Sequence, residues 1–210
     1  MERRIVIAIG RQYGSGGREI GRKLAARLGI PFYDKELLAI AAKDSGLSEE
    51  LFRSADEKPA SSFLYSLMTG TCSIPSGSIA ASEMPLNDQL FLLLSNTVKR
   101  ITRDSSAVII GRCADYVLRK DPDLVSVFIH APIAERVGRV MRIHGIDEAQ
   151  AEDACIRHDR MRSNFHDYYS DSKWGRASTY DLSIESSKLG IDGSVDLILR
   201  YLEIAKGGSR

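Results

Sequence analysis

The chain has 210 residues, of which 29 are Lys or Arg and 28 are Asp or Glu, so its formal net charge at pH 7 is +1. This length fits a single α/β domain over residues 1–210 with a smaller insertion, and the balanced charge gives no reason to expect nucleic acid or an acidic membrane surface as a partner. No apolar run approaches the ~20 residues of a membrane span, so no membrane partner is expected. The cysteines are widely spaced and form no CxxC pair, which predicts free thiols in a reducing, cytoplasmic compartment. They are Cys72, Cys113 and Cys155.

The first part of the chain alternates short apolar runs with helical patterns. Residues 5–9 form a continuous apolar run, which predicts a buried parallel strand, and residues 10–17 are irregular and rich in glycine. From Arg18 the pattern is helical, with apolar residues at every fourth position, and Gly29 ends it. The next expected elements are a strand at 30–33 and a helix at 35–43.

Residues 54–85 interrupt this rhythm, because serines crowd there among glycines and prolines. Such a stretch inside a compact chain is usually functional or mobile, and we expect a mobile insertion on the acceptor side of a binding site. Beyond it, strands are expected at 107–110, 124–129 and 180–184, and helices at 86–103, 133–144, 147–168 and 191–205. Strands that alternate with helices predict a parallel five-stranded sheet with helices on both faces.

The segment between the first strand and the first helix, Ile9 to Glu19, is the strongest functional signal. Its glycines permit positive φ, so that backbone N–H groups converge on phosphate oxygens beside a helix N-terminus. A standard P-loop ends Gly-Lys-Ser/Thr, whereas this chain has Gly16, Gly17 and Arg18, so the usual lysine is missing. Arg18 is the expected substitute cation and a candidate catalytic residue. The candidate cofactor-binding residues are Arg11 across the loop, Gly14, Ser15, Gly16, Gly17, Arg18 and Glu19, with Ser15 as the nearest hydroxyl for a magnesium ion.

Two other interpretations of this loop stay open. One is a structural glycine turn that binds no ligand. The other is the dinucleotide fingerprint of an NAD(P)-binding oxidoreductase, because Asp34 follows Gly14-x-Gly16 by about 20 residues, where a ribose-binding acid would stand. Against the fingerprint, Glu19 occupies its third glycine position, and residues 10–13 make the loop larger than such a turn.

Three segments give the chain a resemblance to a known family. They are residues 11–21, the run Pro-Phe-Tyr-Asp-Lys-Glu-Leu at 31–37, and the run Gly-Arg-Cys-Ala-Asp-Tyr at 111–116. In these segments the chain resembles the cytidylate kinase-like proteins of the P-loop nucleoside monophosphate kinase class. The resemblance implies a P-loop NTPase-like fold with a helical lid, and ATP with Mg²⁺ as the phosphoryl donor.

The resemblance also implies roles for individual residues. The glycine loop would hold the donor phosphates, while Asp34, Arg112 and Asp115 would bind a CMP-like acceptor nucleotide. Cytidylate kinases carry an aspartate that reads cytosine where this chain has Cys113, and a further aspartate in the lid where the matching residue is Met161. A nucleotide other than CMP, or an acceptor that is not a nucleotide, is therefore compatible with the sequence.

The expected lid, residues 133–168, is crowded with arginines. They are Arg136, Arg139, Arg142, Arg157, Arg160 and Arg162. One interpretation is a solvated, salt-bridged helical hairpin, since charge runs usually form such surfaces. The other is a lid that closes over the transferring phosphoryl group, with Arg139, Arg157 and Arg160 as catalytic residues that stabilise its charge. Three histidines in or beside this stretch are expected on the lid surface rather than as metal ligands: His144, His158 and His166.

Together these features predict an ATP- and Mg²⁺-dependent phosphotransferase whose partners are small-molecule nucleotides. Phosphoryl transfer needs mainly positioning and electrostatic stabilisation, and a phosphate oxyanion as acceptor requires no general base. The alternatives are a phosphate-binding regulatory domain without turnover and the oxidoreductase. The sequence leaves the oligomeric state open.

Overall fold

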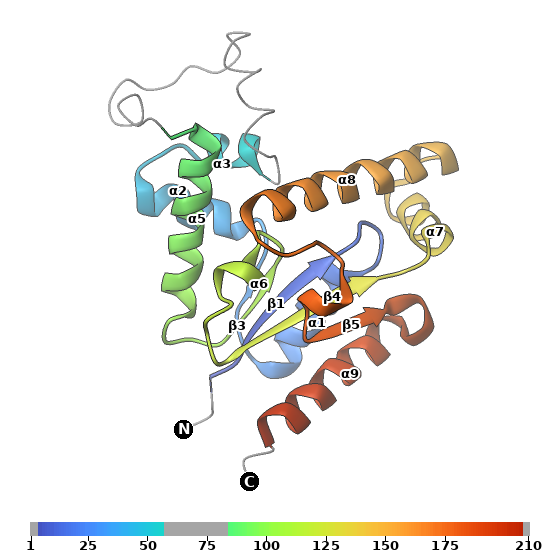
Figure 1. Cartoon of the computed structure of the whole chain (residues 1–210). Helices are drawn as coiled ribbons and strands as arrows, with labels where there is room; N and C mark the ends of the chain where they lie inside the picture. Colours follow the sequence, from blue (N-terminus) through green and yellow to red (C-terminus); the bar gives the residue numbers. More distant parts are fainter. Residues whose placement is uncertain (1–3, 57–83, 208–210) are drawn as a thin grey trace.

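The computed structural model describes residues 4–56 and 84–207 and contains one sheet (Figure 1). Its five parallel strands lie in the order β2-β3-β1-β4-β5, which confirms the predicted five-stranded parallel sheet. The strands are β1 Val6–Arg11, β2 Phe32–Tyr33, β3 Ala107–Ile110, β4 Leu124–His130 and β5 Leu182–Glu185. Most of the insertion expected at 54–85 lies outside the described residues, as does Cys72.

Helices cover both faces of the sheet, as predicted (Figure 1). The helices are α1 Gly17–Leu28, α2 Glu36–Ser45, α3 Glu49–Ala55, α5 Leu86–Thr102, α6 Ala114–Val117, α7 Ile133–His144, α8 Glu148–Tyr169, α9 Ser186–Gly207 and a 3-10 helix at Ala177–Thr179. Side chains of a strand alternate between its two faces. Ile7 and Ile9 therefore pack with α1 and α9, whereas Val6 and Ala8 pack with α2, α3, α5 and α6.

Two short helices were not predicted. Helix α3 begins after Ser48, whose side chain accepts a hydrogen bond from the Leu51 amide, and only its last two residues, 54 and 55, fall within the expected insertion. Helix α6 spans a single turn after β3. The final helix also begins earlier than expected, at Ser186, and Gly190 kinks it with a positive φ of 68°.

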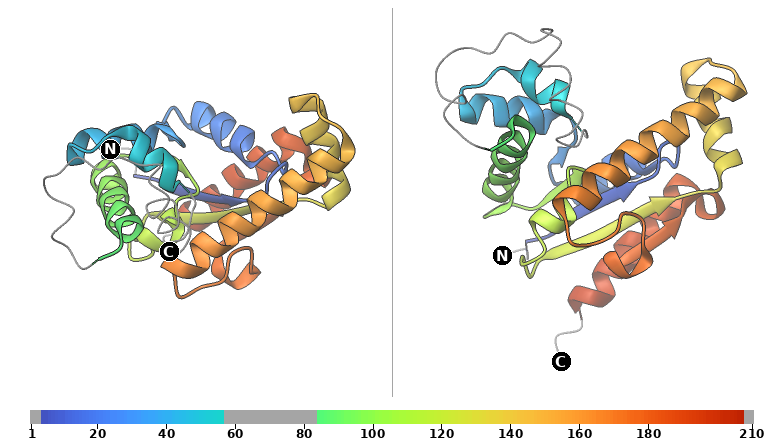
Figure 2. Two further views of the ribbon diagram at one scale, coloured as in Figure 1. Left: turned by 90° about the horizontal axis from the view of Figure 1, so that it is seen from above. Right: turned by 45° about the horizontal axis from the view of Figure 1, so that its top comes forward.

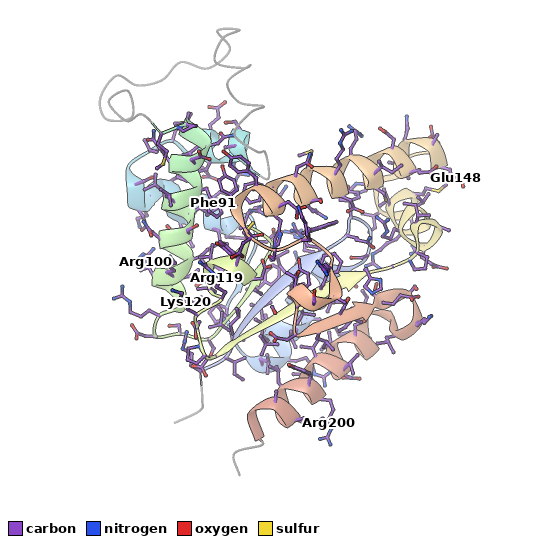
Figure 3. All side chains as sticks on the ribbon, in the orientation of Figure 1. Phe91, Arg100, Arg119, Lys120, Glu148 and Arg200 are labelled. Atoms are coloured by element: carbon purple, nitrogen blue, oxygen red, sulfur yellow. The ribbon has the colours of Figure 1, made fainter. Side chains whose placement is uncertain are left out.

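Helices α7 and α8 form a hairpin that lies over the carboxyl end of the sheet. Figure 2 shows α8 crossing above the strands from α7 toward α5. At that far end Phe91 of α5 stacks on Tyr169, with ring centroids 3.9 Å apart, and Figure 3 shows Phe91 beside the end of α8. The hairpin has its own small core, in which Val140 and Cys155 pack with Tyr13 of the glycine loop. The predicted helices at 133–144 and 147–168 are confirmed to within one residue.

Candidate phosphate-binding site

The glycine loop connects the carboxyl end of β1 to the first turn of α1. A turn closes between Gln12 and Ser15, whose amide donates to the Gln12 carbonyl over 3.3 Å. Gly14 and Gly16 have positive φ values of 77° and 81°, which residues other than glycine rarely adopt. The first amides of a helix have no acceptor within the helix, and those of Gly17 and its two successors lie at this end of α1. Such an arrangement favours an anion.

The loop packs so closely that its glycines have no room for side chains. An ideal Cβ on Gly14 would lie 2.7 Å from the Arg136 carbonyl oxygen, and one on Gly16 would lie 2.7 Å from Cδ1 of Ile191. Glycines at these positions therefore let the loop pack directly against α7 and α9. The residues present fit the phosphates of a nucleotide.

Ser15, the hydroxyl expected near magnesium, is buried inside the loop. Its Oγ donates to the Gln12 carbonyl over 2.8 Å, and its own carbonyl accepts a 2.6 Å hydrogen bond from Ser186 at the start of α9. The first bond closes the loop on itself, and the second fixes it to the start of α9. Within the described ranges 4–56 and 84–207, no group of three His, Cys, Asp or Glu side chains is placed to hold a metal ion.

Arg18, the expected substitute for lysine, is paired with a carboxylate. Its Nε lies 2.6 Å from Oδ2 of Asp34, the residue that follows β2. The second Asp34 oxygen lies 3.8 Å from the guanidinium of Arg112, which in turn lies 2.9 Å from Asp56 at the end of α3. Two of the expected acceptor residues, Asp34 and Arg112, are thus brought together and joined to Arg18.

The backbone at Arg112 has an unusual conformation. Gly111, Arg112 and Cys113 have consecutive positive φ values of 70°, 61° and 53°. Non-glycine residues pay of order 1–3 kcal/mol for such conformations, which cluster at functional sites. This turn carries the chain from β3 into α6 and leaves the Arg112 side chain buried at the carboxyl edge of the sheet. Nothing in the sequence pattern signals three left-handed residues in a row.

The three lid arginines expected to be catalytic are placed differently. Arg139 forms an ion pair with Glu19, and its Cζ would lie 3.3 Å from a Cβ on Gly16, so it borders the glycine loop. Arg157 pairs with Asp153 one turn away on α8, and both side chains are 65% exposed. Arg160 is also exposed. Of the three, the structure brings only Arg139 to the loop.

A buried ion pair between the two lid helices was missed by the sequence analysis. Arg136 Nη1 lies 2.6 Å from Asp159 Oδ2 and donates to the Tyr13 carbonyl over 3.1 Å. Oδ1 of Asp159 accepts a 2.7 Å hydrogen bond from the Tyr13 amide. The pair therefore holds both backbone groups of one glycine-loop residue. Burial raises the pKa of Asp159, while the Tyr13 amide and Arg136 act in the opposite direction.

A cavity of about 20 Å³ lies beside the loop, under α8. Its lining includes Arg11, Arg112, Asp115, Arg162 and His166. Asp115, the third expected acceptor residue, lies 2.8 Å from Nε2 of His166. The prediction that His166 lies on the lid surface was wrong, because its ring is enclosed between Asp115 and Ser170, 3.2 Å away on the other side. In the part of the chain that the structure describes, Cys113 and Cys155 form no disulfide, and both are buried.

Comparison with solved structures shows where this architecture recurs. A crystal structure of an uncharacterised protein from Eubacterium ventriosum is 30% identical, has a TM-score of 0.72 and aligns over 99% of this chain and 100% of that one. Shikimate kinase from Bacteroides thetaiotaomicron is 15% identical with a TM-score of 0.54, covering 95% of this chain and 98% of that one. A gluconokinase from Sinorhizobium meliloti is 14% identical with a TM-score of 0.53, and the alignment covers 99% of this chain and 100% of that one. The chain therefore has the fold of P-loop kinases.

Sequence comparisons give the family. A uronate isomerase from Corynebacterium glutamicum is 30% identical over 123 residues, which are 57% of this chain and 23% of that protein. The matched part thus spans about a quarter of that relative. Among the residues that the structure describes, no helix is long and apolar enough to cross a membrane. The model of the cytidylate kinase-like family matches residues 6–188, which contain all five strands, the glycine loop and helices α7 and α8, and the chain belongs to this family.

Proposed function

We propose that the protein is a phosphotransferase that moves the γ-phosphoryl group of ATP to a nucleoside monophosphate, with a CMP-like acceptor as the first candidate. The observation that carries this proposal is the glycine loop, which joins the carboxyl end of β1 to the N-terminus of α1 and has Arg139 of α7 beside it. Family membership and the P-loop kinase fold support the same reaction class.

The donor would be held mainly by main-chain groups. The amides of Gly17, Arg18 and Glu19 and the N-terminus of α1 supply partial positive charge for the phosphates. Magnesium, when bound with ATP, neutralises charge on the β- and γ-phosphate oxygens. Ser15 would supply a hydroxyl for that ion, and Arg139 would offset charge that develops in the transition state.

The acceptor would lie between the glycine loop and the cavity. Arg112 offers a buried guanidinium for its phosphate, held in place by Asp34 and Asp56, and Asp115 lines the same cavity. A phosphate oxygen attacks as an anion and needs no proton acceptor. Because Cys113 replaces the aspartate that reads cytosine in cytidylate kinases, the identity of the base is the part that an assay must decide.

A second candidate is a nucleotide-binding regulatory domain without turnover. The specific observation in its favour is that the loop lacks its lysine while the arginine expected to replace it, Arg18, is engaged by Asp34. This candidate predicts ATP binding without chemistry.

The deciding experiment measures ADP production from ATP and Mg²⁺ with CMP, dCMP, UMP, AMP and GMP in turn. Magnesium-dependent ADP formation with one acceptor, absent in Gly16→Val, supports the proposal, because valine at that position collides with Ile191. Gly138→Ala is the matched control, since a Cβ there meets nothing within 4 Å. ATP binding without ADP formation from any acceptor would favour the regulatory candidate. Tight NAD(P) binding that is indifferent to Mg²⁺ would restore the oxidoreductase interpretation.

A further inference from the structure

The backbone position of the missing lysine packs against another residue, Arg11. In a P-loop the lysine stands where this chain has Gly17. An ideal Cβ on Gly17 would lie only 2.6 Å from Cβ of Arg11 and 3.2 Å from its Cγ. Real Cβ atoms do not approach one another so closely, so a lysine at residue 17 could not stand beside the present position of residue 11. The stem of Arg11 therefore starts next to the point from which a lysine stem would start.

Arg11 also lies between the two halves of the proposed site. It is the last residue of β1, and strand alternation places it on the same face as Ile7 and Ile9, the face covered by α1. Its carbonyl accepts a 3.2 Å hydrogen bond from Arg162 of α8, which fixes its backbone. Arg11 touches the glycine loop at Gly17 and lines the acceptor-side cavity as well.

Arg18 is less well placed than Arg11 to provide a positive charge for a bound phosphate. It stands at the Ser/Thr position of the P-loop pattern rather than at the lysine position. Its Nε lies 2.6 Å from Asp34, which is buried, and contact with a phosphate would take the guanidinium away from that carboxylate. Leaving a buried carboxylate without its closest cation is costly.

From these contacts we propose that Arg11, rather than Arg18, supplies the cation that P-loop kinases take from their lysine. The inference rests on the proposed phosphotransferase function and names the side chain that meets the transferring group. In that step an acceptor phosphate oxygen forms a bond to the γ-phosphorus while the bond to the β–γ bridging oxygen breaks, and ADP leaves with the electron pair. The Arg11 guanidinium offsets negative charge on the γ-phosphoryl oxygens throughout.

The first test compares single substitutions by their affinity for ATP and for inorganic triphosphate, measured by calorimetry. Arg11→Met keeps the aliphatic stem and removes the charge, and it should weaken both affinities at least tenfold. Arg11→Lys should bind both ligands nearly as tightly as the wild type. Arg18→Met should lower the two affinities less than Arg11→Met does. Arg27→Met is the matched control, because Arg27 lies at the far end of α1 in an exposed pair with Asp196. A larger loss for Arg18→Met than for Arg11→Met would overturn the inference.

The second test exchanges the two positions. Gly17→Lys alone should lower the melting temperature and abolish triphosphate binding, because the new side chain meets Arg11. Arg11→Gly combined with Gly17→Lys removes this collision and should restore triphosphate affinity to within about fivefold of the wild type. A folded double variant that binds no better than Arg11→Gly would count against the inference, and if the double variant does not fold, the comparison of Arg11→Met with Arg11→Lys decides alone.

The two proposals fail in different ways. If the wild type binds triphosphate through Arg11 yet forms no ADP with any acceptor, the proposed function fails and the assignment of Arg11 stands. If Arg11→Met leaves triphosphate affinity and turnover unchanged, the assignment fails and the function stands. A wild type that binds neither ATP nor triphosphate overturns both.

Discussion

Replacing Arg136 by methionine tests whether the lid hairpin holds the glycine loop in place. The Arg136 side chain is 9% exposed, and its guanidinium has three acceptors: Asp159 at 2.6 Å, the Tyr13 carbonyl at 3.1 Å and the Ala131 carbonyl at 3.0 Å. Methionine fills a similar volume but donates to none of them. Arg136→Met therefore leaves the Asp159 carboxylate buried without its cation while the Tyr13 amide still donates to it.

The magnitude follows from the burial of the pair. Removing one partner of a buried ion pair destabilises a protein by about 3–5 kcal/mol, and the lower end applies here because the Tyr13 amide still stabilises the carboxylate. For a chain of this size 1 kcal/mol corresponds to roughly 2–4 °C in melting temperature, so the melting temperature at pH 7 should fall by about 6–12 °C.

The loss should depend on pH in a defined direction. Burial already raises the pKa of Asp159 in the folded protein, and removal of Arg136 raises it further. A carboxyl group with a raised folded pKa contributes stability that is present below its unfolded pKa of about 4 and is lost as pH rises through the folded pKa. Arg136→Met should therefore approach the wild type in stability as pH falls from 7 toward 5.

Thermal unfolding followed by circular dichroism at pH 7 and pH 5 measures both effects. Arg157→Met is the matched control, since Arg157 carries the same charge on the partner helix but pairs with Asp153 at a site where both side chains are 65% exposed. Exposed helical pairs contribute at most about 0.5 kcal/mol, so this control should move the melting temperature by no more than about 2 °C. Equal shifts for the two variants, or a deficit of Arg136→Met that does not shrink at pH 5, would refute the reasoning.

Two further substitutions test the local geometry by urea unfolding. Cys113→Gly should lower the free energy of unfolding by less than about 1 kcal/mol, because glycine relieves the strain of the positive φ and so offsets the loss of the buried thiol. Cys155→Gly, in the middle of α8, should lower it by more than about 2 kcal/mol. Equal losses for the two variants would contradict the assignment of backbone strain to Cys113. Ser186→Ala removes the 2.6 Å hydrogen bond to the Ser15 carbonyl and should lower the free energy of unfolding by about 1–2 kcal/mol. The control Ser187→Ala, at the exposed neighbouring residue, should change the free energy of unfolding by no more than about 0.5 kcal/mol. Similar values for the two serines would show that this bond does not anchor the loop.

The fold could be predicted because its signals are local. The apolar run that contains Ile7 and Ile9, the glycines after it and the helical spacing up to Gly29 each lie within a few residues, and the structure reproduces them. Helices α3 and α6 were missed because elements of 7 and 4 residues are too short to show a helical period. Their limits are set by a cap at Ser48 and by the left-handed turn before Ala114.

The part of the candidate site that is formed by backbone groups could be predicted from the sequence. The part that is formed by side chains distant in the sequence could not. The glycine loop could be located from its residues alone. The contact of Asp159 with Tyr13 joins residues separated by 146 positions, and no periodicity reports such a pair. Arg139 and Arg157 are both arginines on amphipathic helices, so the sequence could not tell that only the first of them borders the loop.

The arginines around the loop differ in how readily a phosphate can take them from their carboxylates. Arg18 pairs with Asp34, whose side chain is 4% exposed and would be left with a single cation 3.8 Å away. Arg139 pairs with Glu19, whose side chain is 59% exposed and can return to water. Because an exposed carboxylate loses little when its partner leaves, whereas a buried one loses much, we expect Arg139 to move to an incoming phosphate more readily than Arg18. In the proposed site Arg18 would then keep Asp34 oriented toward Arg112, on the acceptor side.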